Sequence, residues 1–201
     1  MISLSFILPK EKLTLIDSHM ILKEALDLIE HNNFLSLPVT KEDAFLGVIS
    51  KERILSCMME DCTEETIVEA IARQDIPQIQ VSEEMEDAAS LLAETNTPFV
   101  AVINDQNQFL GIITHKTIFN HYIRIFGFNK GHKLIVTTYD TPGRLALLTD
   151  VITKSGGNII SLLVDNPNVS FNLVKIILRV ESDNLSKLKE NIEDAGFSIR
   201  S

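Results

Sequence analysis

The sequence lacks the signatures that most enzyme classes require. Its 201 residues contain no P-loop, no G-x-G-x-x-G fingerprint, no G-x-S-x-G segment and no H-E-x-x-H zinc motif. The five histidines and two cysteines form no grouping with the spacing of a metal site. We therefore expect a protein that is not an enzyme and that has no metal or other cofactor.

Long apolar stretches and excess positive charge are also missing. No run approaches the roughly 18 apolar residues that span a bilayer, and the first residues show no basic segment typical of a secretory leader. At a net charge of −10, binding to nucleic acid would be opposed by repulsion. We expect a cytoplasmic protein without nucleic-acid or membrane partners, in which Cys57 and Cys62 are reduced thiols on or under a helix.

What the sequence does contain is an internal repeat. The segment "FLGVISKERI" (residues 45–54) returns as "FLGIITHKTI" (residues 109–118), and each of these FLG segments follows a helical apolar pattern and a short apolar strand. Each copy reads strand, helix, strand, strand, helix. Two copies predict a pair of half-domains that bury their sheets against each other. Between them we expect a connecting helix with Thr63 as its N-cap.

The last third of the chain has another pattern and another charge. Residues 1–129 hold 9 Lys/Arg and 20 Asp/Glu, whereas residues 130–201 hold 9 and 8. From residue 132 the pattern predicts strand, helix, strand, strand, helix, strand, which is the ferredoxin-like order. The expected strands and helices cover residues 132–139, 140–155, 159–165, 170–181, 184–196 and 197–200, with a turn at 166–169. A mixed α+β and α/β chain with parts at 1–62, 63–129 and 130–201 is therefore predicted.

The repeated unit resembles the CBS domain over residues 6–127. The resemblance rests on "SLPV" and on a small residue, an apolar pair and a hydroxyl residue, namely Gly47-Val48-Ile49-Ser50 and Gly111-Ile112-Ile113-Thr114. The C-terminal part resembles the ACT domain through Asp140, Pro142, Gly143, Leu145 and Gly156-Gly157-Asn158. The combination resembles AcuB-type CBS–ACT regulatory proteins and bacterial CBS proteins that bind cyclic di-AMP.

The resemblance implies two adenine-nucleotide clefts, each shared by both motifs. Ser50 and Thr114 stand where a strand ends and a helix begins, so each hydroxyl and the first helical N–H groups are expected to face one anion. One expected site combines Lys12, Thr14, Leu35, Ser36, Leu37, Pro38, Thr114, His115, Lys116 and Thr117. The second combines Gln78, Gln80, Phe99, Val100, Ala101, Ser50, Lys51 and Arg53.

Two positions depart from the family pattern. Many CBS motifs have a ribose-binding Asp where this chain has Arg53 and Thr117. Arginine accepts no hydrogen bond, and threonine replaces the carboxylate poorly. A cyclic dinucleotide has no free 3′ hydroxyl and presents two phosphates, so we expect cyclic di-AMP before AMP, ADP or ATP. A site that has lost its ligand is also consistent with these residues.

The ACT resemblance implies a ligand turn at Asp140, Pro142 and Gly143, facing Asn158 and Ile159 across a subunit interface. Such domains bind amino acids or hold dimers together, and we favour dimerisation. The expected function is a non-catalytic, homodimeric regulator that senses a nucleotide and acts on an unidentified protein target. The alternatives are a ligand-free dimerisation and docking module, or an amino-acid-gated regulatory subunit of a metabolic enzyme.

Overall fold

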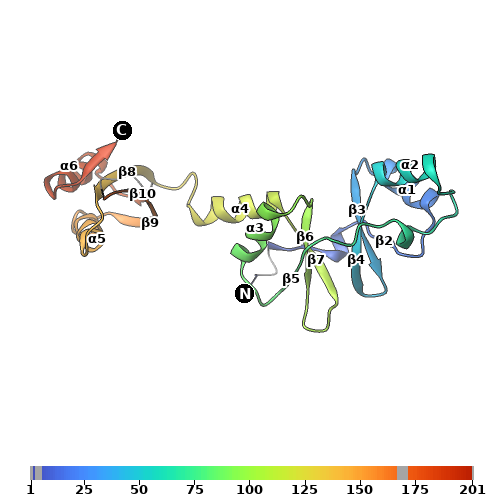
Figure 1. The fold of residues 1–201 in the computed structure, drawn as a ribbon. Coiled ribbons are helices and arrows are strands. Elements are labelled where there is room, and N and C mark those ends of the chain that lie inside the picture. The colour runs from blue at the N-terminus through green and yellow to red at the C-terminus, as the bar shows by residue number, and fades with distance from the viewer. Residues whose placement is uncertain (1, 3–5, 167–171, 201) are drawn as a thin grey trace. The chain divides into compact units, whose positions relative to one another are not determined.

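The structure is a computed structural model that describes residue 2, residues 6–166 and residues 172–200 (Figure 1). The chain forms two compact units, Met1–Phe119 (unit 1) and Asn120–Ser201 (unit 2). The division falls within helix α4, ahead of the boundary expected near residue 130. No helix of the described part is long and apolar enough to span a membrane.

The first motif of unit 1 is a three-stranded sheet with two helices. Its elements are β2 (Ile16–Asp17), α1 (Leu22–His31), β3 (Ser36–Lys41), β4 (Ala44–Ser50) and α2 (Lys51–Glu60). The sheet order is β2-β3-β4, and antiparallel pairing places Ser36 opposite Ser50. Leu22, Ala25 and Ile29 share one face of α1 because three or four residues separate them, and all three are buried.

The second motif repeats this arrangement, with one strand from the start of the chain. Its elements are β1 (Leu8–Pro9), β5 (Gln78–Gln80), α3 (Met85–Glu94), β6 (Phe99–Ile103), β7 (Phe109–Thr114) and α4 (His115–Ile125). The sheet order is β1-β7-β6-β5, with Leu8 opposite Ile112. The predicted strand, helix, strand, strand, helix order is confirmed in both motifs.

The two motifs bury their sheets against each other, as predicted. The phenylalanines of the two FLG segments, Phe45 and Phe109, lie with ring centroids 5.2 Å apart, and Phe99 lies 6.0 Å from Phe45. These residues belong to one buried cluster that also includes Val48 and Ile112. Because both motifs supply the cluster, neither can bury its inner sheet face without the other.

The glycine of each FLG segment allows another segment to cross close to the strand. A Cβ atom at Gly47 would lie 2.2 Å from the carbonyl oxygen of Arg73, and one at Gly111 would lie 2.3 Å from that of Leu8. The backbones of Val48 and Arg73 exchange two hydrogen bonds of 2.9 Å at this crossing. Glycine is therefore required in both copies for the same steric reason.

The prediction of a connecting helix between the two motifs was wrong. Only a single 3₁₀ turn, η3 (Val68–Ala70), forms there. The N–H of Thr63 bonds to the hydroxyl of Thr66, and the N–H of Val68 donates to the carbonyl of Met20. Val68 is fully buried in the first motif's core, so tertiary contacts override the local helical pattern.

The expectation of reduced thiols was also wrong, since Cys57 and Cys62 form a disulfide. Cys57 lies in the last turn of α2, and the N–H of Cys62 donates to its carbonyl oxygen at 2.8 Å. This turn folds the chain back and leaves the two Cα atoms 5.1 Å apart, a separation that a disulfide spans.

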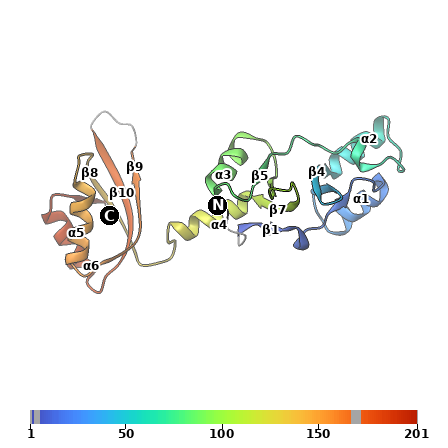
Figure 2. The same ribbon diagram turned by 90° about the horizontal axis from the view of Figure 1, so that it is seen from below.

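Unit 2 contains a four-stranded antiparallel sheet with two helices on one face (Figure 2). Its elements are β8 (His132–Tyr139), α5 (Arg144–Lys154), β9 (Asn158–Asp165), β10 (Leu173–Glu181), α6 (Leu185–Asp194) and β11 (Ser198–Arg200). The sheet order is β11-β8-β10-β9. The predicted ferredoxin-like order is confirmed, while most of the expected turn (167–169) and the first expected residues of the third strand (170–171) lie outside the described residues.

Candidate functional site

A cavity of about 1170 Å³ opens in unit 1 where β4 ends and α2 begins; we call it the Ser50 cleft. The first motif contributes the start of β3 and the first turns of α2. Arg73 comes from the segment that connects the motifs, and residues 96–98 come from the turn before β6. The cleft is therefore lined by both motifs.

Local pairing explains why these residues meet. Ser36 lies opposite Ser50 in the β3–β4 hairpin, and the N–H of Lys51 donates to the carbonyl of Leu35 at 3.0 Å. The Ser50 hydroxyl caps α2 by accepting the N–H of Arg53 at 3.1 Å. The N–H groups of Lys51 and Arg53 are thus already bonded. An anion in this cleft would instead contact the side-chain cations and the Ser50 hydroxyl. The hydroxyl still has its own proton to donate.

Three cations line the Ser50 cleft, in different environments. Lys51 pairs with Glu30 at 2.8 Å, and Arg53 forms no ion pair with any residue that the structure describes. Arg73 donates to both carboxylate oxygens of Asp75, at 2.6 and 3.1 Å. These hydrogen bonds raise the pKa of Arg73 and lower the pKa of Asp75.

The equivalent place in the second motif differs in its hydroxyl chemistry. Thr114 and Thr117 lie with their hydroxyl oxygens 3.0 Å apart, and the N–H of Thr117 reaches the Thr114 hydroxyl at 3.3 Å. His115 and Lys116 follow Thr114 in the exposed first turn of α4. One of the two threonine hydroxyls therefore donates its proton to the other.

The structure groups the predicted nucleotide residues differently from the sequence interpretation. The strand with Leu35, Ser36, Leu37 and Pro38 lies with Ser50, Lys51 and Arg53, and not with Thr114. Gln78 and Gln80 pair beside the strand of Phe99, Val100 and Ala101, and Phe99 lies opposite Thr114. The structure does not bring the crosswise groups together, because each hairpin keeps the hydroxyl beside its own motif's strand.

Lys12 and Thr14 follow a strand whose register carries the chain away from Thr114. Strand β1 places Pro9 opposite Gly111, so the following turn η2 (Lys10–Lys12) runs toward the start of β7. There Lys10 pairs with Asp43 at 3.5 Å. Thr114 stands at the other end of β7, and this register does not support the expected meeting of Lys12 with Thr114.

Sequence reasoning missed Arg73 and the turn at residues 96–98. Arg73 is the only Lys or Arg between residues 54 and 115, in an acidic stretch, and this isolation was a signal. The turn carries no such signal, because Asn96, Thr97 and Pro98 reach the cleft only through the packing of the two motifs.

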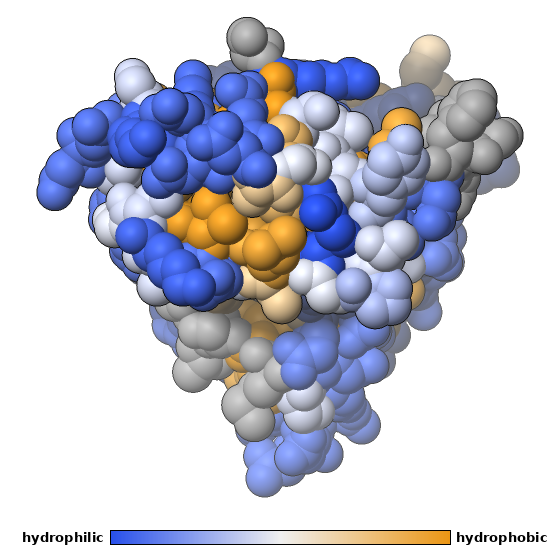
Figure 3. Space-filling view, turned by 90° about the vertical axis from the view of Figure 1, so that its left-hand side faces the viewer, coloured by the Kyte–Doolittle hydropathy of each residue, from blue (hydrophilic) through white to orange (hydrophobic). Residues whose placement is uncertain are grey.

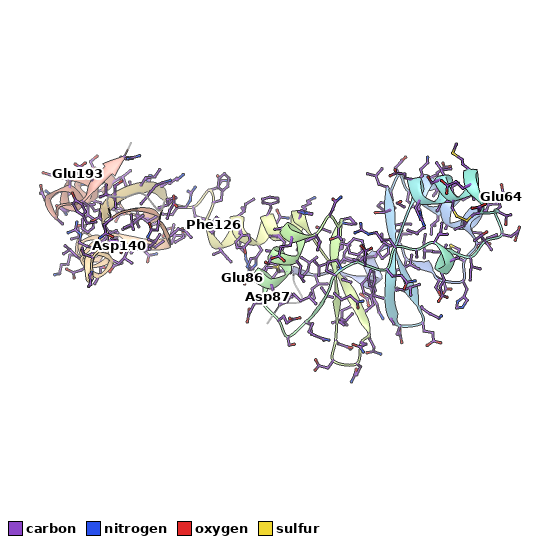
Figure 4. All side chains as sticks on the ribbon, in the orientation of Figure 1. Glu64, Glu86, Asp87, Phe126, Asp140 and Glu193 are labelled. Carbon is purple, nitrogen blue, oxygen red and sulfur yellow. A yellow bond between two sulfur atoms is a disulfide. The ribbon has the colours of Figure 1, made fainter. Side chains whose placement is uncertain are left out.

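Unit 2 has a smaller cavity of about 330 Å³. It is lined by the predicted turn with Asp140, Pro142 and Gly143 and by Val164 of β9 (Figure 4 labels Asp140). Asn158 and Ile159 do not line it. They stand at the opposite end of β9, since Asn158 pairs with Glu181 while the cavity lies where Val164 pairs with Ile176.

Arg144 fixes one wall of this smaller cavity. Its guanidinium donates to the hydroxyl of Thr138 at 2.8 Å and to the carbonyl of Gly196 at 2.7 Å. The group also lies 4.0 Å from the centre of the Phe197 ring. No group of three or more potential metal ligands occurs among the described residues of either unit.

Comparison with known proteins gives two kinds of match. The CBS domain model matches residues 7–60 and 68–124, more than half of the chain. One similar structure is CbpB in complex with c-di-AMP, with 25% identity and a TM-score of 0.54 over 60% of this chain and 83% of that one. A second is CbpB from Streptococcus agalactiae, with 24% identity and a TM-score of 0.54 over 63% of this chain and 85% of that one. A third is CBSX2 in complex with AMP, with 21% identity and a TM-score of 0.53 over 61% of this chain and 96% of that one. No curated protein sequence matches the chain.

Proposed function

The chain belongs to the CBS-domain family, and we propose that its paired motifs bind an adenine nucleotide as a regulatory ligand. The Ser50 cleft carries this proposal. It combines a hydroxyl with Lys51, Arg53 and Arg73 in the acidic part of the chain. Hydroxyls and cations of this kind bind phosphates. The complexes of the similar proteins CbpB with c-di-AMP and CBSX2 with AMP support an adenine nucleotide as the class of ligand.

Cyclic di-AMP is the favoured ligand, and AMP, ADP or ATP come second. Neither Arg53 nor Thr117 can replace a ribose-binding carboxylate, whereas arginines suit a ligand with two phosphates. The volume of about 1170 Å³ lies just above the roughly 300–1,000 Å³ of ordinary small-molecule sites, so it suits a dinucleotide.

The proposed action is regulatory and not catalytic. A ligand in the Ser50 cleft would touch Ser50 of the first motif and residues 96–98 of the second. It would therefore favour one arrangement of the two motifs over another, to the extent that it binds that arrangement more tightly. The changed surface would be read by a protein target in the cytoplasm.

We further propose that unit 2 acts as an ACT-type module whose main role is homodimerisation, with amino-acid binding at Asp140–Gly143 as the second possibility. Unit 2 exposes Tyr139, Leu145, Leu147 and Val164. Figure 3 shows hydrophobic surface among hydrophilic residues on one face of this unit. A dimer that dissociates in Val164→Lys but persists in Val164→Thr, measured by analytical ultracentrifugation, is the expected result.

A thermal-shift panel tests the ligand. Cyclic di-AMP should raise the melting temperature of the full chain most, AMP, ADP and ATP less, and cyclic di-GMP at equal ionic strength not at all. The absence of a shift with every adenine nucleotide would refute nucleotide sensing and favour a ligand-free docking module. A shift with amino acids alone would assign sensing to unit 2 and favour a regulatory subunit of a metabolic enzyme.

A further inference from the structure

The internal repeat allows the two nucleotide-binding places to be compared position by position. Val48 and Ile112 occupy equivalent positions in the two FLG segments. Val48 pairs with Arg73, and Ile112 pairs with Leu8. Arg73 and Leu8 are therefore equivalent residues on the two crossing segments. One motif receives a guanidinium beside its hydroxyl residue where the other receives an exposed apolar side chain.

Arg73 is held at the Ser50 cleft by hydrogen bonds with three residues. Its N–H and carbonyl both bond to the backbone of Val48. Its guanidinium donates to both oxygens of Asp75 and to the carbonyl of Asn96 at 3.0 Å. Its side chain is still 43% exposed and lines the cavity. A flexible cation loses conformational entropy when it binds an anion. Arg73 is already held in place, so most of this loss occurs before the ligand arrives.

The other equivalent positions give no net charge difference. Lys51 and Arg53 of the first motif correspond to His115 and Thr117 of the second, but Glu52 corresponds to Lys116, and this exchange cancels the gain. Arg73 alone therefore gives the Ser50 cleft its additional positive charge. The hydroxyl of Thr114 is also engaged with that of Thr117, while Ser50 keeps its own proton to donate.

From these differences we infer that the two places are not equal: the Ser50 cleft is the one that binds the ligand's phosphate, and Arg73 is the residue that decides this. The inference rests on the proposed function and sharpens it. Asp75 is then a competitor that positions Arg73 and that the phosphate must displace or share. The place at Thr114 is left with one lysine, and one of its two threonine hydroxyl protons is used within the Thr114–Thr117 pair.

The test exchanges the equivalent residues. Isothermal titration of the full chain with cyclic di-AMP, and with AMP in parallel, should give a binding constant at least about 10-fold weaker in Arg73→Leu, because a charge-assisted hydrogen bond is lost. Leu8→Arg should stay within about 3-fold of the wild type. Arg73→Lys should fall between, since lysine lacks the planar fork.

One further variant separates ligand contact from a structural role. Asp75→Asn keeps Arg73 but removes its carboxylate partner, so affinity should stay equal or increase. If the Arg73–Asp75 pair only held the fold, Asp75→Asn would weaken binding as Arg73→Leu does, and the inference would be overturned. Unchanged binding in Arg73→Leu with loss in Thr114→Ala would overturn it as well. No binding by the wild type would instead refute the proposed function itself.

Discussion

Substitution of Gly47 by alanine tests the close crossing that builds the Ser50 cleft. The new Cβ would lie 2.2 Å from the oxygen and 3.0 Å from the carbon of the Arg73 carbonyl, and 3.1 Å from the Cα of Gln74. All three atoms are backbone, so no side chain can rotate away. Either the crossing segment shifts or the strand does.

The cost follows from these contacts. Overpacking costs about 1–3 kcal/mol, and the two hydrogen bonds between Val48 and Arg73 add roughly 0.5–1.5 kcal/mol each if they break. We therefore expect Gly47→Ala to lower the free energy of unfolding of unit 1 by about 2–6 kcal/mol. The same shift would displace the Arg73 guanidinium and weaken nucleotide binding.

Urea unfolding followed by far-UV circular dichroism is the suitable assay, because the chain has no tryptophan and its two tyrosines, Tyr122 and Tyr139, lie in unit 2. Hydrogen exchange at the amides of Val48 and Arg73 locates the effect. Gly157→Ala, whose Cβ would first meet the side chain of Ile152 in unit 2, should leave the unit 1 transition unchanged. A Gly47→Ala chain with unaltered stability and unaltered protection of these amides would show that the crossing at Gly47 is not as close as described.

Three further predictions concern unit 1. Phe109→Ala should cost about 3–5 kcal/mol in urea unfolding, because the ring is 1% exposed in the cluster between the motifs. Phe119→Ala is the control, since its ring is 66% exposed and its loss should cost under about 1 kcal/mol. Equal losses would contradict the packing described. Cys57→Ser should lower the free energy of unfolding by roughly 2 kcal/mol, because the short loop closed by the disulfide is lost. Wild-type protein treated with a reductant should be as unstable as this variant. A variant as stable as the oxidised wild type would speak against the disulfide. Because Arg73 lowers the pKa of Asp75, the stability that this carboxylate adds is present above its unfolded pKa near 4 and is lost as the pH falls through its lower folded pKa. The free energies of unfolding of wild type and Asp75→Asn should therefore differ at pH 6 and converge in acid. A difference that stays constant with pH would argue against the pair.

Much of the fold could be predicted because the repeat and the apolar periodicity are local signals. The two FLG segments predicted paired half-domains, and the apolar faces of α1, α3, α5 and α6 predicted their helices. The connecting segment failed for the opposite reason. Val68 belongs to a core that is built mainly from residues distant in sequence, and its N–H donates to the carbonyl of Met20, far away in the chain.

The candidate site was predicted in its parts but not in its assembly. Ser50, Lys51 and Arg53 were identified by their place at a strand-to-helix junction, and all three line the cleft. The structure pairs them with the strand of their own motif and not with the expected one, because the motif alone does not specify the hairpin register. Arg73 was missed because it reaches the cleft through the crossing that Gly47 permits.

Hydrogen exchange of the full chain with and without cyclic di-AMP shows whether an adenine nucleotide binds in the Ser50 cleft, because it reports binding and location together. We expect slower exchange in peptides that cover residues 50–53, 73 and 96–98, with little change around residues 114–117. Unchanged exchange throughout, or protection around residues 114–117 without protection at residues 50–53, would show that the nucleotide does not bind in this cleft.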